Sequence, residues 1–63
     1  MLTTPLWKVE VEVQHGAKTF SVFPLVRAEH EAQARARAEQ NTNAELDGLG
    51  TVVGIVTVER ITS

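Results

Sequence analysis

The chain has 63 residues, and its six basic and eight acidic side chains leave a net charge of -2. A chain of this length forms one domain, residues 1–63, which buries only about 60% of its unfolded surface, so association with a second subunit would add needed stability. The lack of cysteine excludes disulfides and thiolate metal sites. The weak charge provides no broad electrostatic footprint for nucleic acid or anionic membranes.

No segment is typical of a secretory leader or a membrane span. The first residues, MLTTPLWK, lack a basic region followed by an apolar run. The most apolar stretch, 52–58, contains Gly54 and Thr57 and is too short to cross a bilayer. We therefore expect a cytoplasmic protein.

Residues 7–23 predict a hairpin of two antiparallel strands. We expect His15 and Gly16 to form a two-residue loop, since Gly16 supplies a positive φ. Val11 then opposes Phe20, and the apolar side chains of both strands share one face. A three-residue loop would mix polar and apolar side chains on both faces.

Residues 27–40 are rich in Ala, Glu, Gln and Arg and predict a helix. The sequence has no preferred capping residue near its start, and we expect its end at residues 41–43. The stripe expected to face the sheet consists of Ala28, Ala32 and Ala36. The charged stripe beside it, expected in solvent, consists of Arg27, Glu31, Arg35 and Glu39. Alanines bury little area, so leucines are expected to fill the core: Leu25, Leu46 and Leu49.

Residues 51–61 follow a turn at 47–50 and are dominated by Val and Ile, which predicts a third strand. A right-handed crossover through the helix makes it parallel to the second strand and places it beside the first. Pro24 lacks a backbone donor, so the second strand should lie at an edge. The expected fold class is α+β, a single β-β-α-β domain whose three-stranded sheet of order 2-1-3 carries one helix on one face.

The third strand is apolar on both sides. We expect Val52, Val56 and Val58 to face the helix, with Gly54 allowing its close approach. The residues expected on the opposite face form a predicted protein interface, because one monomer cannot cover both faces: Phe23, Val53, Ile55, Thr57 and Ile61. The alternative interpretation is that these are scattered surface side chains without a function.

No residue pattern indicates catalysis, so we expect no enzyme activity, cofactor or metal. His15 and His30 lack the spacing of metal ligands. Glu10 and Glu12 share a polar strand face, and their surroundings give no reason for one to act as a general acid and the other as a general base. Ser21 can point toward Glu10, but no histidine is placed to activate it.

The helix entry reads Val26-x-Ala28-x-x-Glu31-Ala32-x-x-x-Ala36 and lies between a hairpin and a strand rich in Val and Ile. This pattern resembles small strand-strand-helix-strand domains, including the archaeal ribosomal protein LX type. The resemblance implies a module associated with RNA or DNA. Such a module would use Arg35, Arg37 and Arg60 in a dimer that doubles a weak basic patch.

The function that we expect first is a small non-catalytic protein-binding module. Its expected partners are a second copy, in a homodimer, and an unidentified protein; nucleic acid and membranes are not expected partners. Small cysteine-free chains of this type are typical of phage and mobile-element regulators or inhibitors that occlude a partner protein.

Overall fold

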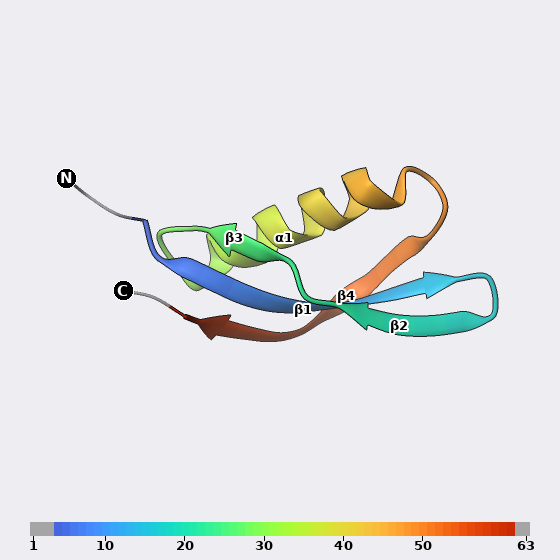
Figure 1. Ribbon diagram of the computed structural model, residues 1–63, viewed down its shortest axis with the longest axis horizontal. Coiled ribbons are helices and arrows are strands. Elements are labelled where there is room, and N and C mark those ends of the chain that lie inside the picture. The colour runs from blue at the N-terminus through green and yellow to red at the C-terminus, as the bar shows by residue number, and fades with distance from the viewer. Residues whose placement is uncertain (1–3, 62–63) are drawn as a thin grey trace.

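The computed structural model describes residues 4–61, which form four strands and one helix. In chain order these are β1 (Leu6–His15), β2 (Lys18–Val22), β3 (Leu25–Arg27), α1 (Glu31–Leu46) and β4 (Thr51–Arg60). The strands form one antiparallel sheet, and α1 lies across it (Figure 1). The predicted α+β architecture with a single helix is confirmed.

β1 is the central strand of the sheet. Val11 of β1 opposes Val22 of β2, and Trp7 opposes Val26 of β3 in the same register. β2 and β3 therefore lie end to end along one edge of β1. β4 pairs with β1 over residues 7–14 and so occupies the other edge. The predicted order 2-1-3 is confirmed, with the second strand divided into two segments.

The division of this edge strand lies at Phe23 and Pro24. The Val9 amide donates a 3.1 Å hydrogen bond to the Pro24 carbonyl, but Pro24 has no N–H to donate in return. The ladder loses one bond at this point, and regular pairing resumes at Leu25. The expectation that the second strand lies at an edge of the sheet is confirmed.

The hairpin loop lies one residue later than predicted and consists of Gly16 and Ala17. Gly16 has a φ of 62°, as the first central residue of a type II′ turn requires. Val11 consequently opposes Val22, so the predicted pairing with Phe20 was wrong by two residues. A shift of two leaves every side chain on its face, and the predicted sharing of one face by the apolar residues holds.

The start of α1 also differs from the prediction. Arg27 belongs to β3, and the helix begins at Glu31. His30 is the N-cap, since its Nδ1 accepts a 3.2 Å hydrogen bond from the Gln33 amide. Gln33 Oε1 in turn accepts from the Glu29 amide at 2.7 Å. This reciprocal arrangement resembles a capping box built on an uncommon capping residue, which is why the sequence did not indicate it.

The helix continues through residues 41–43, where the sequence predicted its end, and stops at Leu46. Asp47 adopts the left-handed conformation, with φ 46° and ψ 46°, and its amide donates to the Asn43 carbonyl at 3.2 Å. Packing of Thr42 and Leu46 against the sheet outweighs the low helix propensity of the polar residues around them.

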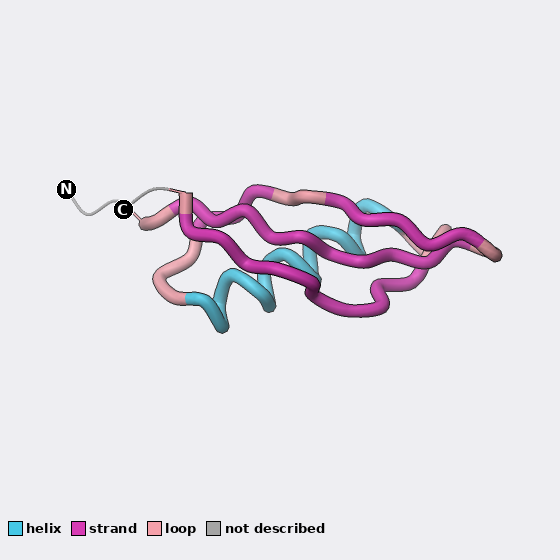
Figure 2. Tube along the Cα trace, turned by 90° about the horizontal axis from the view of Figure 1, so that it is seen from below, coloured by secondary structure: helices cyan, strands magenta, loops and turns pink. Residues whose placement is uncertain are grey.

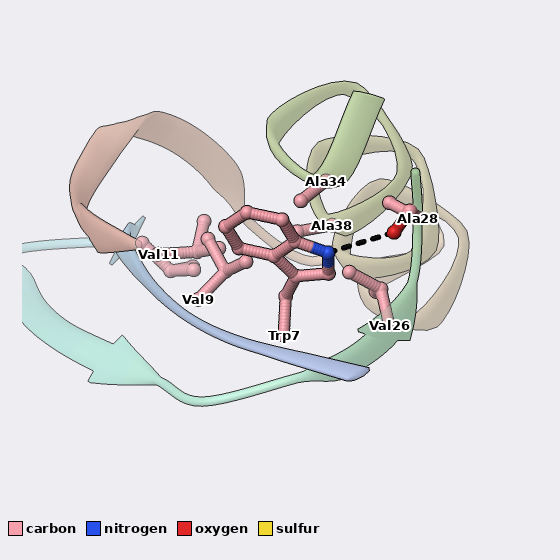
Figure 3. Close-up of a cluster of buried hydrophobic side chains, with 8 residues drawn as sticks. Trp7, Val9, Val11, Val26, Ala28, Ala34 and Ala38 are labelled. Atoms are coloured by element: carbon pink, nitrogen blue, oxygen red, sulfur yellow. Dashed lines mark hydrogen bonds between the residues drawn. The ribbon is translucent and has the colours of Figure 1, made fainter. Parts of the chain in front are cut away.

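The buried stripe of α1 consists of Ala34, Ala38 and Thr42. The predicted stripe was wrong, because Ala32 and Ala36 are exposed on the helix and Ala28, although buried, precedes it. Small side chains bring the helix close to the valines of β1 and to the Trp7 indole (Figure 3). The buried cluster is Trp7, Val9, Val11, Val13, Val26, Ala28, Ala34 and Ala38.

The leucines fill less of this core than expected. Leu46 packs partly buried against the cluster, whereas Leu25 and Leu49 are exposed. The helix packs on β1, β3 and β4, whereas β2 lies farther from it and contributes only Val22 to the edge of the core. The tip of the hairpin therefore extends beyond the helix.

β4 departs from simple alternation, because its register with β1 shifts twice and leaves Val53 and Val56 as bulge residues. The residues that pack on the core are consequently three apart: Val52, Ile55 and Val58. The predictions that Val56 faces the helix and that Ile55 faces away from it were wrong. The helix does not approach the sheet closely at Gly54 either, since a Cβ there would meet no atom within 4 Å.

Candidate protein interface

The sheet has one face covered by α1 and one open face. Trp7, Val9, Val11 and Val13 are buried under the helix, so the alternate residues of β1 point to the other side. Directly opposed residues of neighbouring strands share a face, which extends this assignment to β2, β3 and β4. Figure 2 shows α1 on one side of the strands, and no other described element covers the opposite side. We call that side the open face.

The open face has an apolar patch at the end where β3 lies. Its four residues come from β1, from the break between β2 and β3, from β3 and from the position after β4, in this order: Leu6, Phe23, Leu25 and Ile61. Phe23 is 53% exposed, Leu25 57% and Ile61 46%. The Ile61 amide donates to the Leu6 carbonyl at 2.8 Å, which holds these two side chains on neighbouring strands. The patch therefore has a fixed backbone frame.

Three of the five residues predicted for an interface lie on this face: Phe23, Thr57 and Ile61. Val53 is exposed at its bulge on β4. Ile55 was wrongly assigned, because the bulge at Val56 turns it into the core, opposite Val11. Leu25 was missed as a surface residue; its position two residues after Phe23 on an extended strand was the signal for it.

Polar side chains occupy the middle of the open face. Glu10 Oε2 accepts a 2.9 Å hydrogen bond from the Ser21 hydroxyl, and its Oε1 accepts one from Thr57 at 3.4 Å. The predicted approach of Ser21 to Glu10 is confirmed. Lys8 Nζ lies 5.7 Å from the centroid of the Phe23 ring, a cation–π distance. A fixed carboxylate and an ammonium group thus flank Phe23.

This arrangement differs from a catalytic triad, in which a histidine lies beside the serine. Ser21 donates to a carboxylate, and no histidine side chain shares the polar centre with it. Within residues 4–61, no three His, Asp or Glu side chains gather to hold a metal ion.

A hollow lies at the edge of the sheet, between the Pro24 break and the C-terminal half of α1. Its lining is mixed: Val22, Phe23, Pro24, Asn41, Thr42 and Glu45. Its volume of about 240 Å³ is below the range of about 300–1,000 Å³ typical of small-molecule sites.

Two of the arginines considered for nucleic-acid binding have contacts within the protein. Arg35 forms an i,i+4 ion pair with Glu31, with Nη2 and Oε2 3.3 Å apart. Arg37 donates to the Arg27 carbonyl. Phosphate binding would compete with both contacts.

Comparison with known proteins gives no relative for this chain: no family model, curated protein or solved structure matches it. The helix in the described region is not long and apolar enough to cross a membrane.

Proposed function

We propose that this chain is a non-catalytic protein-binding module that self-associates through the open face of its sheet. The supporting observation is the apolar patch, where Phe23, in the break between β2 and β3, and Leu25, at the start of β3, are each more than half exposed. Exposed apolar side chains that gather on one face mark interaction sites more often than scattered ones do. Self-association also adds buried surface to a domain with a thin core.

The two edges of the sheet are poor alternatives for association. β2 and β3 are short, with five and three residues, and are separated at Pro24. β4 is longer, but the bulges at Val53 and Val56 distort it. Short edge strands and bulges are features that hinder pairing of sheet edges between molecules. The face is therefore the better candidate surface.

A homodimer of this kind regulates or inhibits another protein by covering its surface, which requires no catalytic group. We prefer this function to nucleic-acid binding because the central strand, β1, carries acidic Glu10 and Glu12 on the open face. RNA-binding sheets present aromatic side chains on the corresponding face.

The test is the molar mass of the protein by sedimentation equilibrium over a wide dilution range. We expect a dimer for the wild type and a loss of dimer for the double variant Phe23→Ser/Leu25→Ser. The matched control is Val53→Ser/Val56→Ser, which removes as many exposed apolar side chains from β4. This control should keep the dimer.

Circular dichroism establishes that each variant is folded before its mass is compared. A folded wild type that stays monomeric at high concentration would overturn the proposed self-association. If the dimer is lost in the β4 control but kept in Phe23→Ser/Leu25→Ser, the contact between copies lies at the β4 edge of the sheet and not on the open face.

A further inference from the structure

Two neighbouring rows of side chains cross the open face from one edge of the sheet to the other. The first row, from β3 through β1 to β4, is Leu25, Lys8 and Glu59. The second row, in the same direction, is Phe23, Glu10 and Thr57. Each row has an apolar residue on one side, a charged residue in the centre and a polar residue on the other side.

We infer that two copies of this chain stack open face to open face, around a twofold axis that crosses the strands midway between these rows. The axis lies in the plane between the two sheets, so the first row of each copy faces the second row of the other. Stacked sheets are about 10 Å apart, and their side chains interdigitate. The inference rests on the proposed self-association and specifies its geometry.

This operation brings complementary groups together in two of the three positions of the rows. Leu25 packs on Phe23 of the second copy, which buries apolar surface twice. Lys8 faces Glu10 of the second copy, which forms two ion pairs related by the axis. Glu59 lies over Thr57 of the second copy, a charged side chain against a polar one.

The charged centre is already arranged for such a contact. Ser21 and Thr57 donate to the two oxygens of Glu10, at 2.9 and 3.4 Å, and hold this carboxylate in place. Lys8 forms no ion pair among residues 4–61 and rests over the Phe23 ring, beside the second row. Its ammonium group is therefore available to a carboxylate of another molecule.

Two other placements of the axis bring like charges together. An axis midway between Glu10 and Glu12 would set these carboxylates against each other. An axis along β1 would place Lys8 on Lys8 and Glu10 on Glu10. Opposed like charges destabilise an interface, so both positions are less favourable than the one between Lys8 and Glu10.

The residues beyond the two rows are compatible with this position. Ile61, next to Leu6 at the end of the patch, would lie over Gly54 of the second copy. Gly54 has open space where a Cβ would stand, so an isoleucine side chain can approach the backbone. The pairing of Leu25 with Phe23 and of Lys8 with Glu10 across the axis is the reason that we assign a second copy as the occupant.

The test uses charge reversal in trans. Lys8→Glu alone and Glu10→Lys alone each oppose like charges twice in a homodimer, so we expect each to raise the dimer dissociation constant at least tenfold. An equimolar mixture of the two variants restores opposite charges at both positions in the heterodimer. We expect sedimentation equilibrium of the mixture to return to within about threefold of the wild type. Lys8→Arg is the matched control and should keep the dimer.

A second measurement does not depend on charge. The chain has no cysteine, so Phe23→Cys and Leu25→Cys each introduce a unique thiol. Under mild oxidation, a mixture of the two variants should form the mixed disulfide faster than either variant forms its own.

The inferred axis is supported if the wild type is a dimer, each charge-reversal variant alone has a lower average molar mass, and the mixture of the two variants has the mass of a dimer again. A dimer that is unaffected by both reversals, or that is not rescued in the mixture, overturns the axis and leaves the proposed self-association intact. A wild type that is monomeric at every concentration overturns both.

Discussion

The Trp7 indole Nε1 donates a 2.8 Å hydrogen bond to the Ala28 carbonyl, which ties the first strand to the entry of the helix. The contact is buried and joins residues 21 positions apart. The ring itself packs against the alanines of α1 (Figure 3). Trp7 thus supplies both the largest apolar surface of a thin core and a polar anchor for the loop before α1.

The first prediction concerns that anchor. Trp7→Phe keeps an aromatic ring but removes the donor, so we expect a loss of about 1–3 kcal/mol from the unpartnered carbonyl and the smaller ring. Urea denaturation followed by circular dichroism, at one protein concentration, measures it. Phe20→Leu, at a ring 44% exposed, is the control and should change stability little. An unchanged urea midpoint in Trp7→Phe would contradict the anchoring role.

The second prediction concerns the hydroxyl of Thr42. This side chain is buried, and its Oγ1 has no hydrogen-bond partner in the described part of the chain. Thr42→Val replaces the hydroxyl by a methyl group of similar size, so we expect a gain of about 1 kcal/mol in stability. Thr42→Ser, which keeps the hydroxyl and loses the methyl, should instead destabilise. A loss of stability in Thr42→Val would indicate that the hydroxyl has a partner.

The third prediction compares two glycines. A Cβ at Gly50 would lie 3.1 Å from the Gln14 carbonyl oxygen and 3.3 Å from Leu46 Cδ2, whereas a Cβ at Gly54 would contact nothing within 4 Å. We expect Gly50→Ala to destabilise by about 1–3 kcal/mol, because backbone must move. In the single chain, Gly54→Ala should be neutral or stabilising by about 0.5 kcal/mol, since alanine restricts the unfolded chain more than glycine does. Thermal unfolding of both variants tests the difference, and an equal effect would refute it.

The fourth prediction tests the bulges of β4 with two adjacent residues. Ile55 packs on the core, whereas Val56 is 51% exposed. Ile55→Lys buries a charge and should unfold the domain, while Val56→Lys should remain folded. Amide NMR spectra distinguish the two results. The opposite outcome would restore the strict alternation that the sequence predicts.

The strands and their order follow from the sequence because alternation and β-branched residues are strong signals. β1 reads as alternating apolar and polar residues, and the β4 prediction, 51–61, ended one residue late. The features that escaped prediction depend on tertiary contacts. The cap of α1 uses His30, a residue type with weak capping preference, and packing of Thr42 carries the helix through its polar end.

The candidate interface was partly predictable because the alternation of side chains along a strand assigns each residue to a face. Phe23 and Thr57 were assigned to the open face from alternation alone. Ile55 was wrong because a bulge inserts one residue and reverses the alternation beyond it. Leu25 was missed because Pro24 was taken as the end of the strand, whereas β3 resumes the register directly after it.

The pairing of β1 with β4 has a consequence for how the chain folds during synthesis. Glu10 and Thr57 are neighbours across the sheet although they are 47 residues apart in sequence. β1, β2 and β3 follow one another and can pair early, but the second edge of the central strand waits for β4. A nascent chain that lacks β4 presents an unpaired edge and uncovered valines, which are the features of an aggregation-prone intermediate. We therefore expect folding to be completed only after β4 has left the ribosome.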